Sequence, residues 1–384
     1  MGIGDCYNVK DFRRLAQRRL PAPIFNYIDG GADDERTLRR NVEAFDDYQL
    51  LPRVLVDTTK IDLRTRVLGS EIAWPLFLSP TAFNKLFHHH AESAVARAAE
   101  KFGTIYSLST LATTSIEDIA KVNGGPKMFQ VYVFKDRGLT REFVARCKAA
   151  GFAAMALTVD VPIAGNRERD YYTGMAMPPR PTLKSWLSFV AHPEWSLNML
   201  LHPEFSVANV TRPGTSGLSG SISVIDYINS QFDRSITWKD AEWLAKEWGG
   251  PFAIKGVHTA EDARLSAESG ASAVMISNHG GRQLDSAPGV LDMLPPIVDA
   301  VGGKIEIIAD GGVRRGTHVL KALALGATAC STGRGYLYAL AAGGQPGVER
   351  ALTLIKSEVE RDMILLGCSK VADIGRHHVQ RLKP

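Results

Sequence analysis

Residues 273–285 read AVMISNHGGRQLD, an apolar run followed at once by polar residues and two glycines. The run from Ala273 to Ile276 is typical of a buried strand. His279 and Arg282 follow the end of this strand. Imidazole can take up a proton near neutral pH, and guanidinium can hold a carboxylate through two parallel hydrogen bonds. We therefore interpret these two residues as a base beside a carboxylate clamp, which suits chemistry at the α-carbon of a small acid.

Short apolar runs of this kind occur eight times, with amphipathic stretches between them. Eight strand–helix units predict an α/β fold of the TIM (β/α)₈ barrel type. An open doubly wound sheet is the alternative, but its G-x-G-x-x-G fingerprint is missing after the first strand. The predicted strands are Trp74 to Ser79, Thr104 to Leu108, Met128 to Tyr132, Ala153 to Val159, Phe252 to Lys255, Ala273 to Ser277, Ile305 to Ala309 and Ala327 to Ser331.

We expect a single domain over residues 1–384, with N-terminal helices, a barrel over about 74–340 and C-terminal helices over 347–384. Capping-box patterns that begin at Thr114, Thr237 and Thr259 predict helix starts. An insert over about 165–237 follows the fourth strand and is too long for one helix. Its part from Met175 to Pro213 is rich in bulky apolar residues, which predicts a lid, a helical insert or a segment lying on a membrane. Gly214 to Gly220 reads as flexible.

Composition excludes several classes of protein. The chain has 384 residues, 45% of them hydrophobic and 22% charged, as in soluble globular proteins. A net charge of +4 is too weak a bias to indicate nucleic-acid binding. Four scattered cysteines argue against disulfides or zinc and favour a reducing compartment. Without a visible signal sequence or membrane span, we expect a cytoplasmic protein. We expect no metal at His88-His89-His90, because adjacent side chains diverge.

The ends of the predicted strands are nearly all polar or ionisable. Active residues of such barrels lie at the carboxyl ends of the strands, so we expect one shared site. The last two strands end in DGGVRRG, from Asp310, and in TGRG, from Thr332. Their glycine N–H groups and arginines indicate a phosphate site, which a substrate or a cofactor could equally occupy.

Together these motifs resemble the FMN-dependent α-hydroxy-acid oxidase and dehydrogenase family, which includes glycolate oxidase and L-lactate dehydrogenase. The similarity runs from Tyr27-Ile28-Asp29-Gly30-Gly31-Ala32 to the C-terminal region. The blocks that begin at Ser277 and Asp310 carry it, and Gln130-Val131-Tyr132 and Lys255-Gly256-Val257 support it. The resemblance, not the spacing of residues, supplies FMN as the phosphate-bearing group.

The resemblance also implies a role for each candidate residue. His279 would be the base, and Asp160 would pair with it. Arg282 and Tyr27 would hold the substrate carboxylate, with Arg167 as a second, mobile arginine, and Tyr132 would bind the substrate hydroxyl. Lys255 would face the N1/C2=O edge of the flavin. The other implied cofactor contacts are Pro80, Thr81, Ala82, Ser109, Gln130, Thr158, Ser277 and Asp310, with Gly311, Gly312, Arg314, Gly333 and Arg334 at the phosphate.

The implied reaction is oxidation of an L-2-hydroxy acid to a 2-keto acid, by hydride transfer or through a carbanion. Leu111 and Ala82 suit a lactate-like substrate better than mandelate. Residues 191–195 resemble the membrane-contacting segment of the dehydrogenase branch, which implies peripheral membrane contact through about 175–213 and a quinone or other membrane acceptor. Ala82 is often found in the oxidases, so a soluble oxidase that uses oxygen and forms hydrogen peroxide is the alternative. The resemblance further implies a homotetramer.

Two other classes stay open. One is an FMN barrel enzyme of another type, such as an isomerase, in which the clamp formed by Arg282 would be idle. The other is a flavin-binding interaction protein without turnover.

Overall fold

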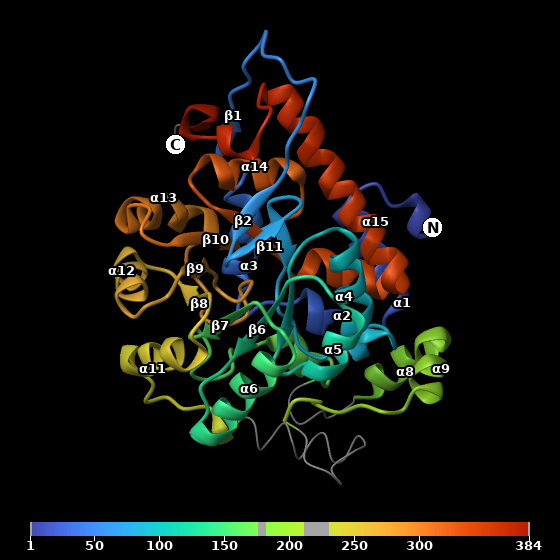
Figure 1. Ribbon diagram of the computed structural model, residues 1–384. Coiled ribbons are helices and arrows are strands. Elements are labelled where there is room, and N and C mark those ends of the chain that lie inside the picture. Colours follow the sequence, from blue (N-terminus) through green and yellow to red (C-terminus); the bar gives the residue numbers. More distant parts are fainter. Residues whose placement is uncertain (1, 176–181, 211–229, 383–384) are drawn as a thin grey trace.

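Eight parallel strands close into a barrel in the computed structural model, which describes residues 2–175, 182–210 and 230–382 (Figure 1). Each predicted apolar run overlaps one barrel strand, so the predicted TIM barrel is confirmed. Around the barrel the order is β10-β11-β4-β5-β6-β7-β8-β9. The strands are β4 (Leu76–Leu78), β5 (Tyr106–Ser109), β6 (Lys127–Val131), β7 (Ala154–Thr158), β8 (Phe252–Val257), β9 (Ala273–Ile276), β10 (Glu306–Asp310) and β11 (Ala329–Thr332).

Helices alternate with these strands along the chain and cover the outside of the barrel (Figure 1). Thr237 and Thr259 occupy the N-caps of two of them, as the capping patterns predict. The predicted start at Thr114 is wrong by one residue, because Ser115 accepts the backbone N–H of Asp118 and caps the helix instead. The helices are α4 (Ala91–Lys101), α5 (Ile116–Val122), α6 (Arg137–Ala149), α11 (Trp238–Trp248), α12 (Ala260–Glu268), α13 (Val290–Val301), α14 (Gly316–Ala324) and α15 (Arg334–Leu366).

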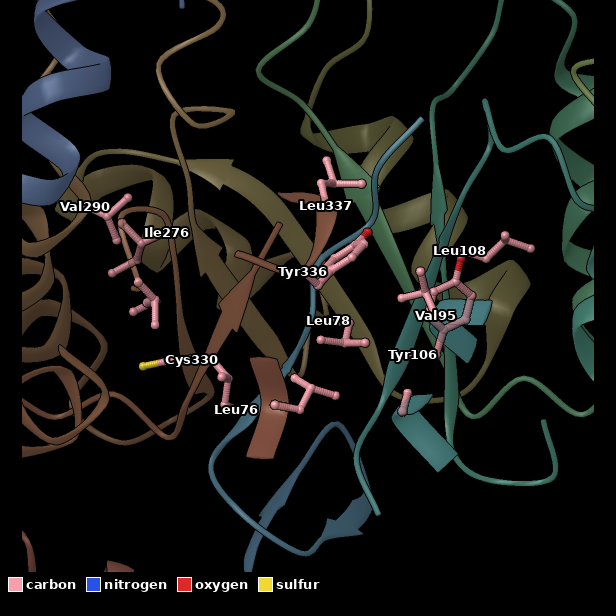
Figure 2. Close-up of a cluster of buried hydrophobic side chains, with 14 of the residues drawn as sticks. Leu76, Leu78, Val95, Tyr106, Leu108, Ile276, Val290, Cys330, Tyr336 and Leu337 are labelled. Carbon is pink, nitrogen blue, oxygen red and sulfur yellow. The ribbon is translucent and has the colours of Figure 1, made fainter. Parts of the chain in front are cut away.

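Side chains on the barrel strands alternate between the interior and the helical layer. Leu76 and Leu78 of β4 pack with residues of the surrounding helices, such as Val95 of α4 (Figure 2). Phe77, between them, belongs to a separate interior cluster with Met128 and other residues from neighbouring strands. Both faces of each strand are therefore buried, which explains why the sequence shows continuous apolar runs rather than alternation.

The N-terminal and C-terminal regions pack against each other outside the barrel. The predicted N-terminal helices are α1 (Val9–Arg19), α2 (Ala22–Asp29) and α3 (Arg36–Glu43), and a 3₁₀ turn (Ile3–Asp5) precedes them. Strand β1 (Tyr48–Leu50) pairs antiparallel with β12 (Val379–Arg381). A hairpin of β2 (Thr65–Val67) and β3 (Ser70–Ile72) leads to the barrel.

The C-terminal region is only partly helical. Helix α15 is interrupted at Gly343 and Gly344, and it ends at Leu366. Gly367 then takes φ 75°, a left-handed conformation that favours glycine and ends a helix. Two 3₁₀ turns (Val371–Asp373 and Arg376–His378) and β12 follow, so helices predicted to fill residues 347–384 are wrong beyond Leu366.

The insert after β7 contains three described helices: α7 (Glu168–Tyr172), α8 (Leu183–Ala191) and α9 (Pro193–Leu201). Helices α8 and α9 form a hairpin that lies beside α2 (Figure 1). Ser188 accepts the backbone N–H of Ala22 at 2.9 Å, and the indole N–H of Trp195 donates to the Leu86 carbonyl at 2.8 Å. The flexibility predicted for Gly214 to Gly220, and the ends of the apolar stretch at 176–181 and 211–213, lie outside the described residues.

None of the helices in the described ranges is both long enough and apolar enough to cross a membrane.

Candidate active site

A cavity of about 320 Å³ opens at the carboxyl ends of the barrel strands. Nearly all the residues that the sequence singles out for the site line it, although they come from distant parts of the chain. Asp160 and Ser277 are the exceptions, and each is bonded to a lining residue. The predicted residues that line the cavity are Tyr27, Pro80, Thr81, Ala82, Ser109, Leu111, Gln130, Tyr132, Thr158, Arg167, Lys255, His279, Arg282, Asp310, Gly311, Gly312, Arg314, Gly333 and Arg334.

His279 and Asp160 form a hydrogen-bonded pair at the cavity wall. The Nδ1 atom of His279 lies 3.1 Å from Oδ1 of Asp160. Gly256 makes this approach possible, because its φ is 105° and a Cβ there would lie 2.7 Å from the Cβ of Asp160. Burial favours the neutral acid, but the charges of His279 and Lys255 outweigh it and hold the pKa of Asp160 below its usual value. An ionised Asp160 fixes the tautomer with Nδ1 protonated, which leaves Nε2 to accept a proton.

Lys255 is a buried cation with a counter-ion built into the barrel. Its Nζ lies 3.1 Å from Oδ2 of Asp310 and donates to the Ser277 hydroxyl at 2.9 Å. Three hydroxyls, those of Ser79, Ser277 and Ser331, donate to the two oxygens of Asp310. Burial alone would raise the pKa of Asp310, but Lys255 and these hydroxyls lower it to about 2. Burial likewise opposes the charge of Lys255, yet Asp310 and Asp160 raise its pKa.

Two arginines gather around the ring of Tyr27. The guanidinium carbons of Arg282 and Arg167 lie 4.9 and 5.4 Å from the ring centroid. Arg282 donates to the Tyr27 carbonyl at 2.5 Å, but among the described residues it forms no ion pair. Burial and the nearby Arg167 lower the pKa of Arg282 to about 10. A carboxylate ligand would supply the missing negative charge.

Arg314 and Arg334 follow β10 and β11 and line the same cavity. Burial lowers the pKa of both, and neither forms an ion pair within the part of the chain that the structure describes. The guanidinium of Arg334 donates to the carbonyls of Ile28, Gly30 and Gly280. Helix α15 begins directly after Gly333, which lines the cavity, and no described side chain caps this N-terminus. Two cations without ion pairs and an uncapped helix N-terminus together suit a phosphate group.

The polar walls also fit a flavin ring. Gln130 and Thr158 are 3% exposed, and the amide nitrogen of Gln130 and the hydroxyl of Thr158 are buried without a hydrogen-bond partner among the described residues. Such orphaned groups are rare unless a ligand satisfies them. The oxygen of the Gln130 amide accepts the Ser109 hydroxyl at 2.9 Å, which directs the amide nitrogen elsewhere. The residues at this end of the barrel thus match a ring with polar edges and a phosphate tail.

Some lining residues were not identified from the sequence. Asp170 lines the cavity although it reads as a charged surface residue of the insert, and no sequence signal marked it. Apolar side chains from several separate segments complete the wall, and only the contact between distant segments reveals them. The apolar set is Ile28, Phe83, Phe87, Val161, Ala164, Phe232, Val313 and Leu337.

The histidines at 88–90 lie outside this cavity and differ from expectation. Their ligand atoms lie within 4.8 Å of one another, so the prediction that the three side chains diverge is wrong. The rings of His88 and His89 stack at a centroid distance of 4.4 Å, and Lys85 and Arg19 line the same small pocket.

Comparison with known proteins agrees with this geometry. The family model described as "FMN-dependent dehydrogenase" matches residues 16–381. The chain is 42% identical to glycolate oxidase 1 of Oryza sativa subsp. indica, covering 98% of this chain and 96% of that protein. It is 40% identical to a putative L-lactate dehydrogenase of Mycobacterium tuberculosis, covering 99% and 91%.

Solved structures give the same result. The crystal structure of the monotopic membrane protein (S)-mandelate dehydrogenase superposes with a TM-score of 0.94 at 36% identity, covering 98% of this chain and 100% of that one. The family match extends over nearly the whole chain and includes every strand of the barrel. The chain is therefore a member of the FMN-dependent α-hydroxy-acid oxidase and dehydrogenase family, an FMN flavoprotein with oxidoreductase activity on 2-hydroxy acids.

Proposed function

We propose that this enzyme oxidises a lactate-like L-2-hydroxy acid to the 2-keto acid, with His279 as the base. The observation that carries the proposal is the pairing, in one cavity, of a histidine oriented by Asp160 with Arg282, a buried cation that forms no ion pair among the described residues. Bound FMN supplies a two-electron acceptor in this cavity. Every other function in the reaction falls to side chains of the chain itself.

In this proposal Arg282 and Arg167 bind the substrate carboxylate, and the Tyr27 ring between them limits its position. The Nε2 atom of His279 takes a proton from the substrate, and the ionised Asp160 stabilises the imidazolium that results. Burial and the charge of Asp160 raise the pKa of Tyr132, so its phenol stays protonated and donates to the substrate hydroxyl. Lys255, which Asp310 holds as a cation, would stabilise negative charge at the edge of bound FMN.

The apolar wall supports an alkyl substituent on the substrate. Leu111 and Ala82 line the cavity with Phe83 and Val161, and none of these side chains offers a hydrogen bond to a polar substituent. A lactate-like acid with a short aliphatic chain therefore suits this wall, and glycolate would leave part of it uncovered. One methylene in such a pocket is worth about 1–3 kcal/mol, so neighbouring acids should react at different rates rather than be excluded.

An anaerobic titration tests the reaction. The enzyme with FMN bound is mixed in turn with glycolate, L-lactate, D-lactate, L-2-hydroxybutyrate and (S)-mandelate, and bleaching of the oxidised flavin absorption is followed. We expect bleaching by the L-acids, fastest with lactate or hydroxybutyrate. An unchanged spectrum with all five acids would contradict the proposal and favour an isomerase or a binding protein.

For the second half-reaction we propose a quinone or other membrane acceptor, with the α8–α9 hairpin as the membrane contact. Its outward side carries large apolar side chains that are 57% to 76% exposed, at helical spacing. The opposite side is anchored to the protein through Ser188 and Trp195. A related protein of the same fold is described as a monotopic membrane protein. The exposed residues are Leu183, Trp186, Leu187, Val190, Leu197, Leu200 and Leu201.

Vesicle binding tests the hairpin. The double variant Val190→Glu/Leu200→Glu should lose most of its flotation with phospholipid vesicles, because two charges would have to enter the headgroup boundary. Leu55→Glu is the matched control, since Leu55 is fully exposed on a loop outside the hairpin. Equal flotation of both variants, or no flotation of the native enzyme, would contradict membrane contact.

A soluble oxidase is the second candidate, favoured by Ala82 at the cavity wall. Reoxidation of the reduced enzyme distinguishes the two acceptors. Rapid reoxidation by a quinone with little peroxide supports the dehydrogenase, and stoichiometric peroxide in air supports the oxidase. The homotetramer remains a prediction, which light scattering on the purified enzyme would test.

A further inference from the structure

The residue Asp170 has an unusual environment for a carboxylate in an inserted helix. It lies in α7, is only 3% exposed, and lines the active-site cavity. Its Oδ2 lies 2.9 Å from Nε of Arg167, the residue at the N-cap of the same helix. Neither atom makes a hydrogen bond of good geometry, so the contact is an ion pair rather than a fixed fork. Charge, more than hydrogen bonding, is therefore what Asp170 contributes here.

Asp170 acts on both arginines that surround Tyr27. Burial raises the pKa of Asp170, and the charges of Arg167 and Arg282 oppose that rise. In return, Asp170 is the carboxylate that favours the charged form of Arg282, against burial and the repulsion of Arg167. The group around the Tyr27 ring thus holds two guanidinium cations and one built-in carboxylate. One further negative charge would neutralise it.

We propose that Asp170 is a specificity-determining residue that restricts this site to substrates with a single carboxylate. Asp170 already balances the charge of one of the two arginines. A ligand with one carboxylate therefore brings the net charge around the Tyr27 ring to zero. A ligand with two carboxylates leaves one negative charge in excess in a largely buried site. Unbalanced charge is costly where water is excluded. The inference rests on the proposed function, since it takes Arg282 and Arg167 as the carboxylate-binding pair.

The test compares a monoanion with a dianion on the enzyme with FMN bound. Dissociation constants of pyruvate and of oxalate are measured at pH 8 from the perturbation of the flavin spectrum. In Asp170→Asn the ratio of the oxalate constant to the pyruvate constant should fall about tenfold or more, as expected for loss of one nearby charge at an effective dielectric constant of about 20. Glu168→Gln, the same change of charge at an exposed position of α7, should leave this ratio unchanged.

A purely structural role for Asp170 predicts a different result, because loosening the site would weaken both ligands by a similar factor and keep their ratio constant. That outcome overturns the proposal. If Asp170→Asn does not fold, Arg167→Met provides the reverse test: with one cation removed, the ratio should rise about tenfold, and an unchanged ratio overturns the proposal equally. Wild-type enzyme that is not reduced by any 2-hydroxy acid would instead refute the proposed function.

Discussion

The barrel floor around Lys255 and the substrate end around Arg282 both contain buried cations, but only at the first do the carboxylates match the cations: Asp310 pairs with Lys255, whereas Asp170 alone faces Arg167 and Arg282. Lys255 is held by Asp310, which three serine hydroxyls support in turn. Arg282 donates to backbone carbonyls and forms no ion pair among the described residues. The difference indicates that the first region is completed by folding and the second by a ligand. Substitutions in the two regions should therefore affect different properties.

The largest effect is expected at His279, beside the incomplete region. His279→Gln keeps a polar side chain next to Asp160 but removes the proton acceptor. The rate of flavin reduction by L-lactate should fall by about 10²- to 10⁴-fold, the usual contribution of a general base. FMN content should stay unchanged, because other residues form the proposed cofactor contacts. Stopped-flow reduction under anaerobic conditions measures the rate, and a variant that keeps near wild-type rates would show that another residue is the base.

Paired substitutions to methionine test the contrast between the two cations directly. Lys255→Met leaves Asp310 buried without its counter-ion, and the free energy of unfolding should fall by about 3–5 kcal/mol. Arg282→Met removes a cation that has no fixed partner, so stability should be unchanged or rise while kcat/KM for L-lactate falls about 10²- to 10³-fold.

Chemical denaturation of both variants with FMN bound measures the stability difference, and steady-state kinetics measures the loss of activity. Equal destabilisation by the two substitutions would mean that Arg282 has a fixed counter-ion after all, and the contrast drawn between the regions would fail.

The barrel was predictable because its strands are buried on both faces, which leaves an uninterrupted apolar run in the sequence. Because active residues of such barrels lie at the carboxyl ends of the strands, the sequence alone then places His279, Lys255, Asp310 and the glycines after β10 at one end of the barrel. The pairing of strands from opposite ends of the chain leaves no comparable pattern in the sequence. Strand β12 is three residues long and pairs with β1 more than 300 residues away, so its short, polar sequence carries no strand signal, and helix was predicted there.

The residues missed in the site share a physical reason. Asp170 belongs to a five-residue helix of the insert, where a charged residue is most often solvated, and only the position of α7 against the cavity buries it. The guanidinium of Arg334 shows the converse. Its position after β11 indicates a phosphate ligand, yet three of its five N–H groups donate to the backbone carbonyls of Ile28, Gly30 and Gly280. Local sequence identifies which groups reach a site, but packing decides which partners remain open to them.

A third region, around His88, differs from both, because burial keeps this basic side chain neutral and no counter-ion is needed. His88 lies in the pocket beside α9, where burial and the neighbouring His89 and His90 lower its pKa to about 4. Since this pKa lies below the value of about 6.5 for an exposed histidine, protonation favours the unfolded chain. The contribution of neutral His88 to stability is therefore complete above pH 6.5 and is lost progressively as the pH falls towards 4.

His88→Asn should reduce this pH dependence, the smallest of the expected effects. Asparagine keeps an acceptor near the position of Nδ1, which accepts the backbone N–H of His90 at 3.2 Å. Between pH 7.5 and 5.0 the wild-type free energy of unfolding should therefore decline more than that of the variant, as measured by chemical denaturation at both pH values. His377→Asn, at an exposed side chain, is the control. If the two variants and the wild type decline in parallel, burial does not keep His88 neutral, and a counter-ion must balance it as Asp310 balances Lys255.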